Sequence, residues 1–168
     1  MEKEIKDKIV HLINETRVMT LAVSDNDIPW SSPVYFVCHD KNFYFFSNEK
    51  ARHIQYAKDR KAVSASIFHD SDRMDHIFGF QMSGMLEKIS NPVLYLILVK
   101  QYVTKFSFLK QVFGSRTIEN KHFFLEKFNA HLYGFQPDAI FLSDNSRPTD
   151  KRAEIDLNKM DFKILDSN

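Results

Sequence analysis

The first segment of the chain combines apolar and charged residues with the spacing of an α-helix. Ile5, Ile9, Leu12 and Ile13 fall at helical intervals, and charged side chains lie between them. This spacing puts the apolar side chains on one face of a helix and the charged side chains on the other. It predicts an amphipathic helix over residues 2–15 that covers one end of a sheet.

Shorter segments with the composition of β-strands follow this helix. They read VMTLAVS, WSSPVYFVCHD, FYFFS, AVSASIF, IFGFQMSGMLEKI and HLYGFQPDAIFLSD. The turn residues of HDKN join the second and third segments, so residues 30–47 are expected to form a hairpin. Pro33 cannot donate a ladder hydrogen bond, which predicts an edge strand or a bulge. Gly79 and Gly84 permit bends or a close approach of another backbone.

Helices are expected at two further places. Ser47 or Asn48 can cap a short helix that runs to about Lys58, with an acidic residue in its first turn. Asn91-Pro92 predicts the start of a helical insertion near 92–129, divided into residues 93–112 and 118–129 by Gly114-Ser115. Consecutive hairpins with these helices predict a mainly β fold with added α (α+β), an antiparallel barrel forming one domain over residues 1–168.

Composition and charge narrow the classes of function. The net charge is +1, so there is no global field that favours nucleic acid or an anionic membrane. The longest apolar run, residues 93–99, is too short to span a bilayer. A single cysteine excludes an internal disulfide and a multi-cysteine metal site, and the charged N-terminal segment is not a signal peptide, so we expect a cytoplasmic protein.

Two stretches carry candidate chemistry. In FFSNEKARHIQ, a strand-like run ends at Ser47, and Arg52 with His53 follows after one short turn. This arrangement suits an anion site at a helix start, and it equally suits a capped surface helix with Arg52 and His53 in solvent. The second stretch, HDSDRMDH, holds two histidines and three aspartates, but their spacing fits no closed metal site, and a solvated loop is favoured. No metal site is predicted.

Four segments, in their order and spacing, resemble a known family. They are TLAVSDNDIPWSSPVYFV, FYFFSNEKARHIQ, FQMSGMLEKIS and FLSDNSRPTDKR. Together they resemble the flavin-binding split barrel of the pyridoxamine 5'-phosphate oxidase-like superfamily, and within it a branch of uncharacterised bacterial proteins. The resemblance implies a six-stranded antiparallel split barrel, an FMN cofactor, and a homodimer with its sites at the subunit interface. It also implies an oxidoreductase in which the flavin carries the electron or hydride transfer.

The resemblance assigns roles to individual residues. Ser47 would donate its hydroxyl to the FMN phosphate, and Arg52 with His53 would supply charge. Gln81 would lie near the isoalloxazine ring, where an amide both donates and accepts hydrogen bonds. The remaining assigned residues are Ser32, on the strand beside the cofactor, and Lys151 and Arg152, a basic pair that would reach the phosphate from a partner subunit.

Each of these residues also has an interpretation in which it binds no ligand. Gln81 and Ser32 are also ordinary strand residues, and Lys151 with Arg152 is also a solvated basic pair. The oxidase itself carries an arginine and a lysine on the strand where this chain has Ser31 and Phe36, so pyridoxamine phosphate oxidation is not predicted. A second hypothesis is a non-enzymatic binding module of the same barrel, which holds haem or another planar ligand, or a protein partner. His53 is a conceivable axial ligand for haem.

Overall fold

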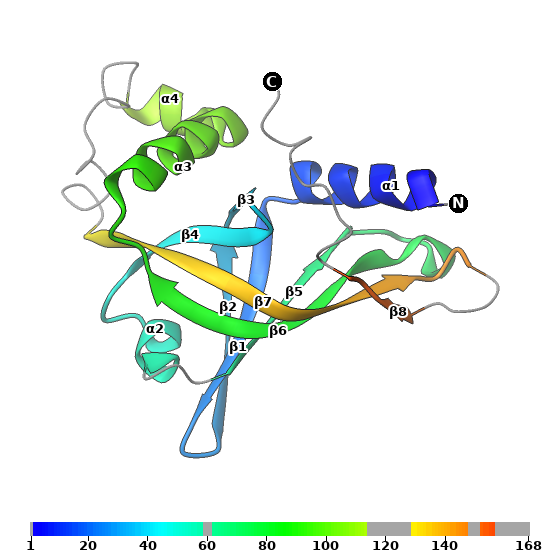
Figure 1. The fold of residues 1–168 in the computed structure, drawn as a ribbon, viewed down its shortest axis with the longest axis horizontal. Coiled ribbons are helices and arrows are strands. Elements are labelled where there is room, and N and C mark those ends of the chain that lie inside the picture. The colour runs from blue at the N-terminus through cyan, green and yellow to red at the C-terminus, as the bar shows by residue number, and fades with distance from the viewer. Residues whose placement is uncertain (1, 59–61, 114–128, 148–151, 157–168) are drawn as a thin grey trace.

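The computed structural model describes residues 2–58, 62–113, 129–147 and 152–156. A strongly curled antiparallel sheet forms most of the fold (Figure 1). Its strands are β1 (Val18–Asp25), β2 (Ile28–Tyr35), β3 (Val37–His39), β4 (Asn42–Asn48), β5 (Val63–Phe68), β6 (Phe78–Lys88), β7 (Ala130–Asp144) and β8 (Arg152–Glu154). The helices are α1 (Glu2–Glu15), α2 (Arg52–Tyr56), η2 (Met74–His76), α3 (Pro92–Lys105) and α4 (Ser107–Phe113).

The strand order explains the shape of the sheet. It runs β2-β1-β5-β6-β7-β4-β3, and β8 adds to β7. The predicted α+β split barrel is confirmed, although the described residues form eight strands and six were expected. The segment predicted as one strand over residues 30–40 divides at Phe36 into β2 and β3, and a short terminal strand pairs with Ser143 and its neighbours. Pro33 lies in β2, which is an edge strand as predicted.

Two tight turns join neighbouring strands, and one β-bulge twists the longest pair of strands. Asn26 and Asp27 adopt positive φ angles in the turn between β1 and β2, and Asp40 with Lys41 does so between β3 and β4. Polar turn residues tolerate this left-handed backbone better than branched ones. In β6 the pairing with β7 shifts register between Ser83 and Gly84. A β-bulge of this kind strengthens the local twist and helps the long strands to curl.

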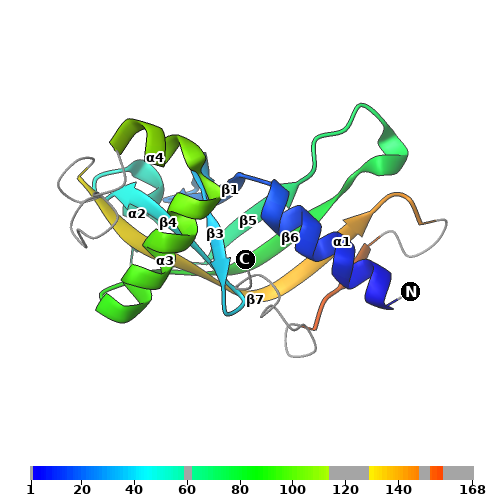
Figure 2. The same ribbon diagram turned by 90° about the horizontal axis from the view of Figure 1, so that it is seen from above.

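The concave inner face of the sheet holds the main hydrophobic core. Phe36, Phe43, Phe45, Phe80 and Phe135 are fully or almost fully buried there. The predicted amphipathic helix is confirmed as α1, and its Ile9, Leu12 and Ile13 pack into this core. Figure 2 shows α1 crossing the sheet, with α3 and α4 at the other end of the molecule.

A second core lies on the opposite face of β4 and β7. Leu98 and Tyr102 of α3 pack there against Tyr44 and Leu132. The hydroxyl of Tyr102 donates hydrogen bonds to the backbone carbonyls of Tyr35 and Tyr44. The helical insertion is therefore the element that covers one end of the outer face of the sheet.

The helical insertion begins as predicted but has a break that was not predicted. Asn91 caps α3 as predicted, and its Oδ1 accepts hydrogen bonds from the amides of Val93 and Leu94. However, the segment predicted as one helix over residues 93–112 divides at Phe106, whose aromatic ring turns into the second core, into α3 and α4. The predicted break at Gly114-Ser115 lies outside the described residues. The predicted helix over residues 118–129 lies largely outside the described residues. Within the described part of the chain, no helix is long and apolar enough to cross a membrane.

Candidate functional site

The short helix α2 follows β4 after a tight turn. The sequence predicted a cap at Ser47 or Asn48, and this prediction was wrong, because the N-cap is Ala51 and no side chain caps it. Asn48 instead uses its Oδ1 to accept a hydrogen bond from the amide of Lys50, at 2.8 Å. This local turn competes with helix capping and delays the start of the helix. As a result α2 begins at Arg52 and contacts the ends of β1 and β2.

Ser47 and His53 form a pair between β4 and α2. The Oγ of Ser47 lies 2.9 Å from Nε2 of His53, and Ser47 is buried. The imidazole ring also contacts the ring of Phe45. Burial lowers the pKa of His53 below its ordinary value of 6.5, because the charged form loses hydration. Near neutral pH, His53 is therefore an uncharged imidazole bonded to a hydroxyl.

Arg52 is positioned by an aromatic contact. Its guanidinium lies 4.2 Å from the centre of the Trp30 ring. Trp30 in turn donates a hydrogen bond from Nε1 to Oγ of Ser32, at 2.9 Å. Arg52 stacks on a ring that is itself fixed to the sheet. Because the stacked side chain is already restricted, it loses less conformational entropy when it binds an anion. Ser32 thus supports Arg52 through Trp30.

The structure places four of the seven residues that the sequence singled out in two neighbouring sets of contacts around α2. Ser47 and His53 are in direct contact, and Ser32 joins Arg52 through the indole ring. We call Ser32, Trp30, Ser47, Arg52 and His53 the α2 cluster. It combines two hydroxyls, a fixed guanidinium and an imidazole, which is donor chemistry suited to an anion.

The other three residues lie apart from the α2 cluster. Gln81 is exposed on the outer face of the sheet, where its strand partners are Ser66 and Phe141. Arg152 is exposed in β8, far from α2 in the fold (Figure 1). Lys151 lies outside the described residues. Within one chain, therefore, Gln81 and Arg152 do not join the α2 cluster.

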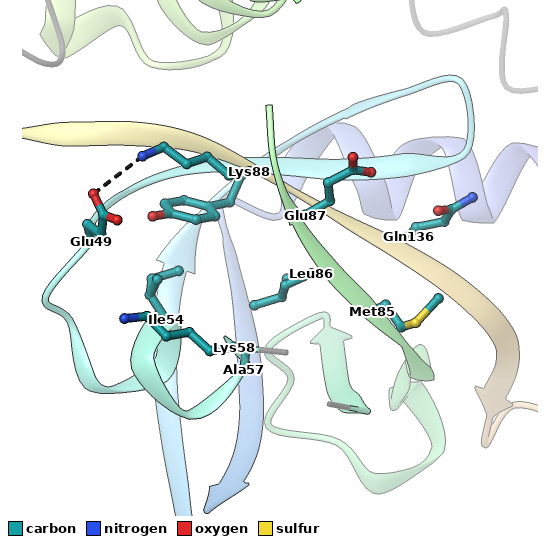
Figure 3. Close-up of a pocket in the computed structure, with 10 residues that line it drawn as sticks. Glu49, Ile54, Ala57, Lys58, Met85, Leu86, Glu87, Lys88 and Gln136 are labelled. Carbon is teal, nitrogen blue, oxygen red and sulfur yellow. Dashed lines mark hydrogen bonds and ion pairs between the residues drawn. The ribbon is translucent and has the colours of Figure 1, made fainter. Parts of the chain in front are cut away.

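A pocket that sequence reasoning missed lies on the other side of α2. Its volume is about 450 Å³, and Figure 3 shows residues of α2 on one wall and residues of β6 on the other. Tyr133 also lines it, and burial raises the pKa of that phenol to about 12, with Glu49 adding to the shift. The pocket residues come from three separate segments, so no local motif could have marked them. None of the α2 cluster residues is among the side chains that line it.

The outer face of β2, β1, β5, β6 and β7 carries exposed apolar side chains. Tyr35 is 53% exposed and Phe141 43% exposed, and Val18 and Phe68 lie on the same face. Small hydroxyl residues occupy the positions between them, such as Ser64 and Ser83. A face with several exposed apolar side chains of this kind is typical of a surface that contacts another protein.

No metal centre accompanies these features in the described part of the chain. There, no group of three or more His, Cys, Asp or Glu side chains is arranged to hold a metal ion. The stretch over residues 69–76 forms an exposed loop in which Arg73 and Asp75 make an ion pair at 2.6 Å. Cys38 is buried and is not part of a disulfide.

Solved structures of low sequence identity share this fold. HutZ, the haem storage protein from Vibrio cholerae, superimposes with a TM-score of 0.61 at 17% identity, over 81% of this chain and 92% of that one. An FAD-binding protein from Mesorhizobium loti gives a TM-score of 0.57 at 13% identity, over 79% of this chain and 89% of that one. At such identities the likeness establishes the fold and not the ligand.

Sequence comparison adds a family. UPF0306 protein PM1958 of Pasteurella multocida (strain Pm70) is 23% identical over 79 residues, which make up 46% of this chain and 53% of that protein. The chain thus matches about half the length of this curated relative. The profile of the family described as Pyridoxamine 5'-phosphate oxidase matches residues 5–129, which include β1 to β6 and the α2 cluster. The chain therefore belongs to the pyridoxamine 5'-phosphate oxidase family.

Proposed function

We propose that this protein binds FMN through the α2 cluster and acts in the cytoplasm as a flavin-dependent oxidoreductase. Arg52 and the Ser47–His53 pair contact the phosphate, and Ser32 holds Arg52 in place through Trp30. The observation that carries this proposal is the position of Arg52, whose guanidinium lies 4.2 Å from the centre of a Trp30 ring that is itself hydrogen-bonded to Ser32. A bound flavin supplies the electron transfer, and the protein supplies binding and orientation.

His53 fits the phosphate role through its protonation. The buried imidazole is neutral near pH 7, because burial lowers its pKa. A phosphate beside it favours the charged form, so FMN and a proton bind together. FMN affinity is therefore expected to fall as the pH rises from 6 to 8. Riboflavin, which lacks the phosphate, serves as the control whose affinity stays constant over this range.

We also propose that the protein is a homodimer that associates through the outer face of the sheet. The exposed Tyr35, Phe68 and Phe141 support this, because an apolar face of this kind gains free energy when it is covered. Gln81 lies on the same face, and in a dimer it would lie within the interface. The roles of Gln81, Lys151 and Arg152 toward the flavin depend on this second subunit. Phe141→Glu is expected to shift the protein to the monomer in analytical ultracentrifugation.

Arg52→Ala is the variant that tests FMN binding. The chain has one tryptophan, Trp30, which lies against Arg52, so flavin binding is expected to quench its fluorescence. We expect the FMN dissociation constant to rise roughly tenfold, as for the loss of a charge-assisted hydrogen bond. The matched control is Arg73→Ala, an exposed arginine in the loop before β6. Equal FMN affinity in both variants would remove Arg52 from the site.

Haem binding is the second candidate, and the likeness to HutZ favours it. The imidazole of His53 would be the axial ligand. Its Nε2 already lies 2.9 Å from Ser47, so binding iron through this atom would cost that hydrogen bond. A Soret band that appears on adding haem and is lost in His53→Ala would support this candidate. Saturable FMN binding at one per chain, without a Soret band, would support the flavin.

A further inference from the structure

The pocket beside α2 lies where β6 extends beyond its neighbour. Strand β5 pairs with only part of β6. The pairing begins at Phe68 with Gly79 and ends at Val63 with Gly84. The last residues of β6, from Met85 to Lys88, continue past this point and line the pocket. Ile54, Ala57 and Lys58 of the α2 segment form the facing wall (Figure 3). The split in the barrel thus leaves a cavity with a volume in the range of small-molecule sites.

The pocket has aliphatic walls and a rim of polar and charged side chains. Ile54 and Leu86 supply aliphatic surface from opposite sides (Figure 3). Tyr133 is buried and stacks on Phe45, and the described residues offer its hydroxyl no hydrogen-bond acceptor. Because burial raises its pKa to about 12, this phenol stays neutral and is a hydrogen-bond donor to whatever enters.

The charges of the pocket select the kind of ligand. Lys88 is neutralised by Glu49, with 3.3 Å between Nζ and Oε2. Lys58 lines the pocket, and no acidic side chain of the described residues lies within ion-pair distance of it. Glu49 and Glu87 would repel a ligand with two or more negative charges. With Lys88 and Glu49 paired, Lys58 is the cation of the pocket that has no acidic partner among the described residues, and it suits a ligand with a single negative charge.

We propose that this pocket binds a compact aromatic monoanion, with its rings between Ile54 and Leu86 and its anionic group at Lys58 and the Tyr133 hydroxyl. The site is separate from the α2 cluster, because Arg52 faces Trp30 on the other side of the helix. The inference does not rest on flavin binding.

A pair of fluorescent probes with the same rings tests the proposal. The first, 8-anilinonaphthalene-1-sulfonate, carries one negative charge, and the second, N-phenyl-1-naphthylamine, carries none. We expect both to bind the full-length protein saturably, with about one molecule of the sulfonate per chain. Lys58→Met should weaken the sulfonate roughly fivefold, as for an exposed charged contact, and leave the neutral probe unchanged. The matched control Lys100→Met, on α3, should change neither.

Two results would overturn the proposal. Equal affinity of the sulfonate for Lys58→Met and for the unaltered folded protein would place the dye elsewhere, for example on the outer sheet face. One-for-one displacement of the sulfonate by FMN would make the pocket part of the cofactor site. Failure of FMN to bind, with the probe results as expected, would remove the flavin proposal and leave this one standing.

Discussion

The outer face of the sheet is covered at one end and open at the other. At the covered end, Leu132 of β7 packs under α3 and is 1% exposed. Nine residues later on the same strand, Phe141 is 43% exposed. The two strand ends differ because α3 and α4, the described part of the helical insertion, cover the first end and extend to Tyr35, whose ring contacts Phe106 and Phe108. Burial on this face is therefore set by the insertion and not by the strands themselves.

The sequences of the strands reflect this difference. The strand β4 reads FYFF through its middle, because both of its faces are packed. The strands β1 and β5 alternate apolar and small polar residues, as in VSASIF, because only one face meets the core. A sheet that is covered on both sides needs continuous apolar runs, and a sheet that is covered on one side needs alternation.

The largest expected effect comes from replacing Leu132, at the covered end of β7, and comparing it with the same replacement of Phe141 at the open end. Leu132→Ala should lower the free energy of unfolding by about 2–5 kcal/mol, because it leaves a cavity under α3. Phe141→Ala should change it by less than about 0.5 kcal/mol in the monomer. Urea unfolding at low protein concentration measures both. Similar losses in the two variants would mean that the open end is also packed within one chain.

A smaller effect is expected at the bulge that curls the long strands. A Cβ atom at Gly84 would meet the carbonyl oxygen of Gln136 at 2.1 Å, and backbone cannot move aside easily. Gly84→Ala should cost about 1–3 kcal/mol of stability. The control is Gly134→Ala at the covered end, where the nearest atom is a Tyr44 ring carbon at 3.0 Å. If Gly134→Ala were the more damaging substitution in thermal unfolding, tight packing under α3 would outweigh the bulge.

A third effect depends on pH and concerns Lys105, at the C-terminal end of α3. Its Nζ donates a hydrogen bond to the carbonyl of Ile13 at 2.8 Å and lies 3.9 Å from the centre of the Phe36 ring. Burial lowers its pKa from 10.5 to about 7. The unfolded chain therefore holds this proton more tightly between pH 7 and 10, and stability should rise with pH across this window by about 3 kcal/mol.

Lys105→Met should remove this rise, and Lys100→Met, on the same helix, should keep it. Urea unfolding at pH 7 and pH 9.5 gives the comparison. A rise that persists in Lys105→Met would have to come from another group.

Much of the fold could be predicted from local patterns. The helix over residues 2–15 and the long strand with Gly79 and Gly84 follow from spacing and backbone geometry alone. The boundaries of α2 could not, because the side chain of Asn48 closes a turn of its own in place of capping the helix. The break at Phe106 was equally hidden, since it depends on the second core into which the ring turns.

For the candidate site, the sequence by itself determined which side chains are available. The spacing of Ser47, Arg52 and His53 along one turn brings them near one another in any strand-turn-helix. Only the tertiary structure decided how they are held, because Trp30 and Ser32 come from a strand that is distant in sequence from α2. The same reason applies to the pocket on the other side of α2. Its walls meet only when the curled sheet brings the ends of β6 and β7 beside that helix.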